Sequence, residues 1–421
     1  MIHRVTRREL AAFCGGAVAT AATGIAAAQS ANPIRIGLGM ALTGPLAPNG
    51  KSALLAMQIW EETVNAKGGL LGRPVKLVTY DDQSNPSNVP ALYTKLLDVD
   101  KVDLIIGGYA TNMIAPALPI AIARNKVFIG LIGLAINAEF GYPRYFAMHP
   151  AGPNPKAATT RGFFEIAMAQ APKPQTVAII ATDAEFSRNA SDGARDNAKA
   201  AGLKIVHDRS FPPNTTDYGP LVRAMQASNA DLACVCSYPL ETVGIIRAVN
   251  EIGYKPKMIG GGMVGTQATA IKTQLGPLLN GIVNFDFWVP APTMQFPGVM
   301  DLIKTYQERS AKEGVDLLGY YMAPWAFADL QVLQQAIEGT KSIDDGKLAA
   351  FLHANTFKTV VGDIKFDDKG ELAIGRTIQT QFQGIKGNDL DQFRNIATQV
   401  IVAPAELKSG SVIYPYEKAR V

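Results

Sequence analysis

The sequence has few of the side chains on which catalytic and metal sites depend. Its 421 residues include only four histidines and three cysteines, and no two histidines have the spacing of metal ligands. Neither a Gly-x-Ser-x-Gly elbow nor a His-Glu-x-x-His motif occurs. We therefore expect no metal and no cofactor, and catalysis is the least favoured class of function.

The sequence also lacks an excess of charge of either sign. There are 40 Lys and Arg against 36 Asp and Glu, which gives a formal charge of +4, and no run of basic residues occurs. Proteins that bind nucleic acid or anionic membranes concentrate Lys and Arg on one face, so neither partner is expected. The chain is 48% hydrophobic and 18% charged, which favours a large core and, at this length, two or more domains.

Residues 1–28 have the features of an export signal. Arg4, Arg7 and Arg8 precede a weakly apolar stretch rich in Ala and Gly, which ends in three alanines typical of a cleavage site. Residues 6–10 partly match the twin-arginine signature, which we favour over general secretion. The alternative is an amphipathic first helix of the fold. No other apolar stretch reaches the roughly 20 residues needed to span a bilayer.

The three cysteines do not indicate a disulfide or a lipid anchor. Cys14 lies in the export signal behind Phe13, where a lipid anchor would need a small residue. Cys234 and Cys236 are two apart on an expected strand, too far from each other for a relaxed disulfide. A metal or redox pair would need a two-residue spacer, so we expect both to be small buried apolar residues.

The segment after the export signal has the pattern of a βαβ unit. An apolar strand over residues 34–40 is followed by helical spacing over residues 54–64. Gly68 suits the left-handed position after a helix. A second strand begins at Val75, and we expect Asp81-Asp82 to turn it out to solvent.

This unit carries four short motifs: Leu42-Thr43-Gly44-Pro45, Asn65-Ala66-Lys67-Gly68-Gly69, Gly72-Arg73-Pro74 and Tyr80-Asp81-Asp82. In these motifs and in the order of its elements the chain resembles the type I periplasmic solute-binding proteins, specifically the receptors for branched-chain and hydrophobic amino acids of ABC importers. The resemblance covers essentially residues 32–405.

Strands and helices continue to alternate along the chain, which predicts mostly parallel sheets flanked by helices. The strand candidates are 102–106, 127–132, 177–181, 204–206, 232–235 and 257–259. Segments rich in Pro and Gly at 143–155 and in Pro at 284–297 interrupt the alternation and indicate two similar lobes.

The resemblance implies that both interruptions, and a third near residues 362–375, are hinge crossings between the lobes. Each lobe is then discontinuous in sequence. The expected division is residues 32–147 and 289–361 for lobe 1, and 148–288 and 362–421 for lobe 2.

Gly260 to Gly265 satisfy the glycine fingerprint of dinucleotide sites. However, the match lies far from the first strand-helix unit, where that fingerprint belongs. The sequence after it contains Pro277 and opens no good helix, and the acid that would bind the ribose about 20 residues further on is missing. We favour a strand-end loop where the backbone passes close to another group.

Loops at the carboxyl ends of strands are the better candidates for a ligand site. In the segment Leu104–Pro116, glycines end a strand and a helix begins near Thr111, so free N–H groups there favour a carboxylate. The resemblance implies that the Thr111 hydroxyl and backbone groups of this loop, including Tyr109 and Ala110, hold the ligand carboxylate. The alternative for Thr111 is a simple helix cap.

The resemblance also implies ligand contacts from other loops. Gly133, Leu134 and Ala135 follow the next strand, and only backbone groups can contribute where relatives often have a threonine. Phe186 and Tyr238 of the second lobe are expected to sandwich an apolar body. All five residues, and Asn49 of the first loop, stand at positions where members of the family contact the ligand.

Gly262 stands at or near the place where amino-acid receptors of the family carry an acid that pairs with the substrate ammonium. Its absence makes an aromatic or aliphatic acid nearly as good a ligand candidate as a branched-chain amino acid. Glu241, Asp183 or Glu185 could supply the charge instead, although Glu241 is better placed to open a helix after Pro239.

We therefore predict an exported, two-lobed α/β protein of the periplasm that binds a small apolar carboxylate, either a branched-chain amino acid or an aromatic or aliphatic acid, between its lobes. It delivers this ligand to an inner-membrane ABC permease. A monomer without a nucleic-acid partner is expected. The alternative is a ligand sensor or regulator on the same fold, responsive to amides or amino acids; the export signal disfavours its cytosolic form.

Overall fold

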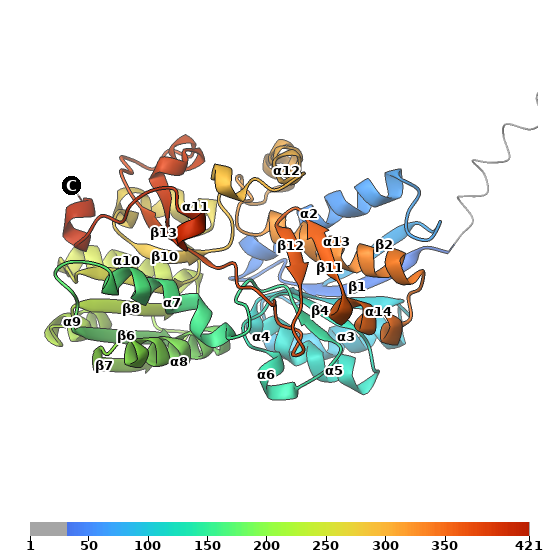
Figure 1. Ribbon diagram of the computed structural model, residues 1–421, viewed down its shortest axis with the longest axis horizontal. Coiled ribbons are helices and arrows are strands. Elements are labelled where there is room, and N and C mark those ends of the chain that lie inside the picture. Colours follow the sequence, from blue (N-terminus) through green and yellow to red (C-terminus); the bar gives the residue numbers. More distant parts are fainter. Residues whose placement is uncertain (1–31, 421) are drawn as a thin grey trace, which may run out of the picture.

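Two sheets lying side by side organise the protein (Figure 1). The computed structural model describes residues 32–420, so the expected export signal and Cys14 lie outside the described residues. One sheet has the strand order β2-β1-β3-β4-β5, and the other has the order β14-β13-β10-β9-β8-β6-β7. Each sheet forms the centre of one lobe, which confirms the expected two-lobed α/β architecture.

The first βαβ unit forms as the sequence predicts. β1 (Ile34–Met40) and β2 (Val75–Asp81) pair in parallel, and α2 (Ala47–Ala66) connects them. The helix ends where Gly68 and Gly69 take φ values of 98° and 76°, which only glycine adopts without strain. A Cβ on Gly69 would also lie 1.9 Å from the Arg73 carbonyl oxygen, so this turn requires glycine.

The two acids that end β2 do not both face solvent, and the expectation for Asp82 is wrong. Asp81 accepts the N–H groups of Leu42 and Thr43 at 3.0 and 3.2 Å, which ties β2 to the loop after β1. Asp82 is only 1% exposed, because the chain folds back and the Ser84 N–H donates to its carboxylate at 2.8 Å. Burial raises the pKa of Asp82 to about 6.

The sheet of lobe 1 is parallel throughout. Its other strands are almost entirely buried, as expected for strands covered by helices on both faces. These strands are β3 (Leu104–Tyr109), β4 (Phe128–Ile132) and β5 (Tyr145–Ala147). Besides α2, its helices are α3 (Val89–Asp98), α4 (Thr111–Ile114), α5 (Leu118–Ala123), α6 (Asn137–Phe140), α12 (Val299–Glu313), α13 (Ala323–Thr340) and α14 (Asp345–Ala354).

The sheet of lobe 2 is parallel except at its C-terminal edge, where β13 and β14 run antiparallel to their neighbours. Its strands are β6 (Thr176–Thr182), β7 (Lys204–Phe211), β8 (Leu232–Ser237), β9 (Met258–Met263), β10 (Val283–Asp286), β13 (Ile378–Phe382) and β14 (Gln399–Ala403). Its helices are α7 (Pro155–Met168), α8 (Glu185–Ala200), α9 (Gly219–Ala227), α10 (Pro239–Ile252) and α11 (Thr269–Leu275).

The chain passes between the lobes three times, after β5, after β10 and before β13. The first and third crossings lie together, because the Arg376 N–H donates to the Pro150 carbonyl at 2.8 Å. β11 (Thr356–Thr359) and β12 (Gly362–Lys365) form an antiparallel hairpin, and β11 packs on α13 of lobe 1. The expected boundary at residue 362 would divide this hairpin, so we place the third crossing between residues 366 and 377.

The glycine run is part of a strand, and the expectation of a strand-end loop is wrong. Gly260, Gly261 and Gly262 lie in β9, between β8 and β10. Gly260 has a φ of 138°, and a Cβ there would lie 1.8 Å from the Val283 carbonyl oxygen. Gly260 therefore allows β10 to approach β9, while Gly261 and Gly262 lie against Cys234 and Cys236 of β8.

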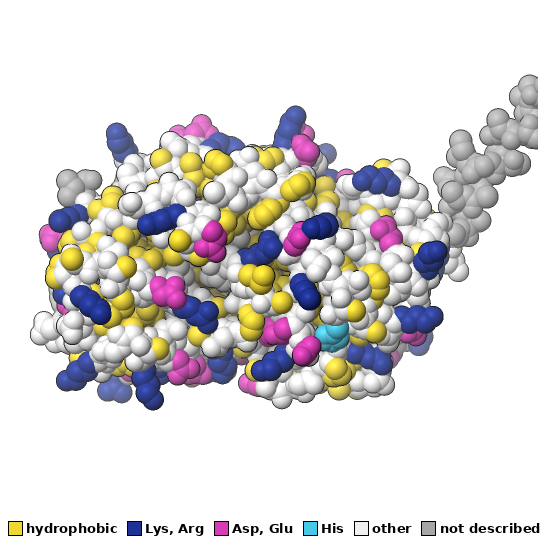
Figure 2. Space-filling view, in the orientation of Figure 1, with side chains coloured by type: hydrophobic (Ala, Val, Ile, Leu, Met, Phe, Trp, Pro, Cys, Tyr) yellow, Lys and Arg dark blue, Asp and Glu magenta, His cyan; other side chains and the backbone are white. Residues whose placement is uncertain are grey.

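Cys234 and Cys236 are free and buried, as predicted. Within residues 32–420, no helix combines the length and apolar character needed to cross a bilayer, and no three metal-ligating side chains gather. Basic and acidic side chains intermingle on the face shown in Figure 2, in agreement with the balanced composition.

Candidate functional site

A small buried cavity lies where the two lobes meet. Its volume is about 20 Å³, which is room for about one water molecule. The residues that line it come from strand ends of both lobes, from the first crossing and from the turn before α13: Tyr109, Ala110, Thr111, Ile132, His149, Phe186, Tyr238, Val264 and Tyr321. Five of these, Tyr109, Ala110, Thr111, Phe186 and Tyr238, are among the residues predicted from the sequence.

The carboxyl end of β3 presents polar groups to the cavity. Ala110 takes a φ of 84°, and Thr111 then begins the single turn of α4. The Thr111 hydroxyl accepts the Leu134 N–H at 3.0 Å, which leaves its own proton free to donate. Asn49 does not line the cavity, but its side-chain amide donates to the Tyr109 hydroxyl at 2.8 Å and so holds that ring.

The loop after β4 supports the site from behind. Gly133, Leu134 and Ala135 do not line the cavity; Leu134 orients the Thr111 hydroxyl. Ala135 is buried with a φ of 58°. The Leu134 carbonyl accepts the Asn189 side-chain amide from lobe 2 at 3.1 Å, so this loop also joins the lobes.

Aromatic rings from both lobes form a continuous cluster around the cavity. Phe186 and Tyr238 meet edge to face at 5.9 Å, and Phe186 contacts Phe285 at 6.1 Å. The cluster continues through Phe287 to Tyr321, whose rings stack at 5.3 Å. Because Phe186 and Tyr238 touch each other here, their role as a sandwich around a ligand stays a prediction.

No carboxylate lines the cavity among the described residues. Gly262 does not line it either: a Cβ at this position would point at the Cys236 sulfur, 2.9 Å away, and Val264 is the residue of this segment at the cavity. Glu241 lies in the first turn of α10, as expected. It is 5% exposed, and burial raises the pKa of its carboxyl group.

Four lining residues escaped the sequence reasoning: Ile132, His149, Val264 and Tyr321. His149 is the most informative, because it is 2% exposed and neither ring nitrogen has a partner among the described residues. Burial lowers its pKa to about 3, so the imidazole is neutral at pH 7. Its position inside an expected hinge crossing could have marked His149 as a candidate site residue. No comparable sequence pattern marked Tyr321.

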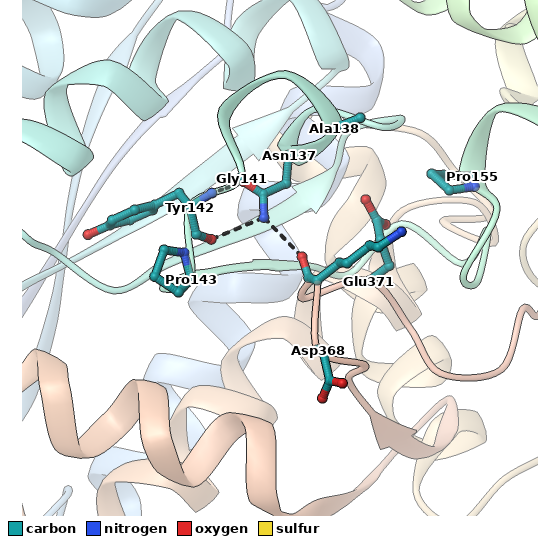
Figure 3. A pocket seen from close by; sticks show the side chains of 9 residues that line it. Asn137, Ala138, Gly141, Tyr142, Pro143, Pro155, Asp368 and Glu371 are labelled. Carbon is teal, nitrogen blue, oxygen red and sulfur yellow. Dashed lines mark hydrogen bonds between the residues drawn. The ribbon is translucent and has the colours of Figure 1, made fainter.

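A second, larger cavity of about 400 Å³ lies beside the first and third crossings. Figure 3 shows Asn137 at its centre, where the side-chain amide donates to the carbonyls of Tyr142 and Lys369 at 3.0 and 2.9 Å. Glu371 lies on the opposite wall, and burial raises its pKa to about 8. Since loops and a hinge form this cavity, whereas open α/β sheets bind ligands at the carboxyl ends of strands, the interlobe cavity is the better ligand site.

Comparison with known sequences agrees with this geometry. A family described as periplasmic binding protein matches residues 33–386. A Leu/Ile/Val-binding protein homolog of Brucella suis is 26% identical over 364 residues, which cover 82% of this chain and 89% of the relative.

Solved structures share the fold. One is LivJ of Streptococcus pneumoniae, a branched-chain amino acid transporter substrate-binding protein in complex with isoleucine. Its TM-score is 0.71 at 18% sequence identity, and the superposition covers 91% of this chain and 100% of the LivJ chain. Another is a solute-binding protein of an R. palustris ABC transporter in complex with 4-hydroxybenzoate. Its TM-score is 0.71 at 19% sequence identity, and the superposition covers 85% of this chain and 94% of that protein's chain.

The family match spans both lobes and all three crossings, and it confirms the resemblance carried by the motifs of the first βαβ unit. The chain belongs to the periplasmic binding protein family, whose members bind small molecules for ABC transporters.

Proposed function

We propose that this protein binds a small apolar carboxylate between its lobes and delivers it to an inner-membrane ABC permease. It acts in the periplasm as a monomer, and it releases its ligand chemically unchanged. The observation that carries the proposal is the composition of the interlobe cavity, which combines hydrogen-bond donors at strand ends with aromatic walls and has no lining carboxylate among the described residues.

The donors at the end of β3 suit a carboxylate. The Thr111 hydroxyl has its proton free, since its oxygen already accepts the Leu134 N–H. The backbone N–H groups of Thr111 and Asn112 have no acceptor within residues 32–420. Hydrogen bonds to a charged acceptor are about twice as strong as neutral ones, so these three donors together can hold a carboxylate in a dry site.

The walls suit an apolar body without an ammonium group. A buried ammonium that lacks an anionic partner costs several kcal/mol in desolvation, and no lining residue in the described chain is acidic. The two solved structures described above hold ligands of both kinds, isoleucine and 4-hydroxybenzoate. The cavity here favours the second kind, an aromatic or aliphatic acid.

Ligand entry requires the lobes to separate. A cavity of about 20 Å³ is far smaller than the sites of roughly 300 Å³ or more that hold drug-sized molecules, and the rings of both lobes fill the space. Bending at the three crossings would open the site and then exclude water as the lobes close again.

Thermal-shift measurements with amino acids, aromatic acids and amides test the class of ligand, because a ligand bound only by the folded state raises the unfolding midpoint. Calorimetry then compares leucine with 4-methyl-2-oxopentanoate, and phenylalanine with a phenyl-substituted acid. We expect the deaminated acids to bind at least as well as the amino acids. Binding of the amino acids alone would show that another acid supplies the charge and would contradict the proposal.

A further inference from the structure

His149 is a buried polar side chain at the cavity that the rest of the protein leaves without hydrogen bonds. It lines the interlobe cavity and is 2% exposed. Neither Nδ1 nor Nε2 finds a partner within residues 32–420. Its ring contacts Phe287 edge to face at 5.0 Å, so apolar surroundings hold it in place.

Such a pair of unpaired nitrogens is unusual. Most buried polar side chains in folded proteins have a hydrogen-bond partner, and exceptions occur where a ligand or water supplies it. A neutral imidazole has one N–H donor and one nitrogen acceptor. A group that both donates and accepts would therefore suit His149 in either tautomer.

The sheet places His149 at a distance from the carboxylate-binding end of the site. β4 lies between β3 and β5. Tyr109 pairs with Ile132 across β3 and β4, and the last β4–β5 pair is Gly130 with Ala147. His149 is two residues beyond Ala147, past the last pair of this register, and it lines the cavity together with Ile132. β4 therefore separates the strand that leads to His149 from β3, so the imidazole and the Thr111 hydroxyl reach the cavity from different strands.

We propose that His149 binds an uncharged hydroxyl group on the end of the ligand remote from its carboxylate. The ligand class is then a ring-hydroxylated aromatic acid. A hydroxyl both donates and accepts, which matches the imidazole, and the aromatic cluster of both lobes provides the walls for the ring. This inference rests on the proposed function, because it takes Thr111 as the carboxylate end.

The test uses calorimetry with three probes: 4-hydroxybenzoate, benzoate and phenol. We expect the unmodified protein to bind 4-hydroxybenzoate at least tenfold more tightly than benzoate. His149→Phe keeps the ring contact with Phe287 and should abolish this difference while benzoate affinity stays within about twofold. His149→Gln keeps a donor and an acceptor and should retain most of the difference.

Equal binding of the two acids by the unmodified protein, or a preference that His149→Phe leaves intact, would overturn the inference. If neither acid binds but phenol does, and only with His149 present, the hydroxyl contact holds, but the ligand is not an aromatic acid and the inference about its class fails. If no probe binds, the inference fails, and the calorimetry with 4-methyl-2-oxopentanoate then decides the proposed function.

A measurement on the unmodified protein covers the case in which His149→Phe does not fold. Imidazole nitrogen signals of ¹⁵N-histidine-labelled protein, with that of His149 assigned from His149→Gln, should shift when 4-hydroxybenzoate is added and shift much less with benzoate. An unchanged His149 signal on saturation with 4-hydroxybenzoate would contradict the contact.

Discussion

The hydroxyl of Tyr238 in lobe 2 donates a hydrogen bond to the side-chain oxygen of Asn112 in lobe 1, with an oxygen-to-oxygen distance of 3.3 Å. The same hydroxyl accepts the Phe186 N–H at 3.3 Å. Tyr238, which lines the cavity from lobe 2, therefore also links the two lobes by a hydrogen bond. The bond from Asn189 to the Leu134 carbonyl adds a second link of this kind.

Tyr238→Phe keeps the aromatic ring but removes this link, so it should favour the open arrangement. Loss of one such hydrogen bond is worth about 1 kcal/mol, which changes the ratio of closed to open molecules about fivefold. Small-angle X-ray scattering of the ligand-free variant should give a larger radius of gyration. Tyr414→Phe is the matched control, because its hydroxyl bonds to Pro172 within lobe 2; equal scattering from both variants would argue against an interlobe role.

Thr111→Ala should weaken binding of any carboxylate ligand by about 1–3 kcal/mol, the loss expected for a hydrogen bond to a charged group. It should also lower stability by about 1 kcal/mol, because the buried Leu134 N–H loses its acceptor. Thr111→Ser restores the hydroxyl and should restore both properties. Calorimetry and thermal unfolding separate the effects, and unchanged affinity in Thr111→Ala would reduce Thr111 to a structural residue.

Glu371 should make the protein less stable as the pH rises from about 4.5 to 8. Burial raises its pKa from 4.5 to about 8 in the folded protein, so over this range the folded state holds a proton that the unfolded state has released. Glu371→Gln should remove this dependence and raise the unfolding midpoint more at pH 8 than at pH 4.5. Glu406→Gln, at an exposed position, serves as the control; the same pH profile for both variants would contradict the prediction.

Gly260→Ala should destabilise the protein by more than about 1 kcal/mol. Its φ of 138° is unfavourable for any side chain, and the new methyl group would lie 1.8 Å from the Val283 carbonyl oxygen. Gly387→Ala is the control, because a Cβ there meets nothing within 4 Å. Urea unfolding that gives the same midpoint for both variants would refute the close approach of β9 and β10.

Residues in strand-end loops could be predicted from the sequence. Thr111 follows an obvious buried strand, and parallel strands bring such loops to one edge of a sheet, so local pattern was enough to find it at the cavity. Phe186 and Tyr238 were found through the resemblance in the same way. The lobe boundary at residue 362 was harder to locate, because a short hairpin in β11 and β12 looks like the start of a crossing.

Local sequence pattern could not show which residues from distant parts of the chain meet at the cavity. His149 and Tyr321 are 172 positions apart in sequence and come together because the chain leaves lobe 1 at the first crossing and returns to it at the second. Asp82 was misplaced for a related reason: its burial depends on the chain turning back over the end of β2. In β9, the three glycines suggested a loop because their packing between β8 and β10 is invisible in sequence.

The repeated passage between lobes also governs how this protein can fold. The indole N–H of Trp60 in α2 donates to Gln334 of α13 at 3.0 Å, across 274 positions of sequence, and lobe 2 gains its last two strands only after residue 377. Contacts of such long sequence separation slow folding, and incomplete chains expose apolar surface. Neither half can finish its core during synthesis until most of the polypeptide exists, so we expect the newly made chain to remain unfolded for long enough to need protection from aggregation.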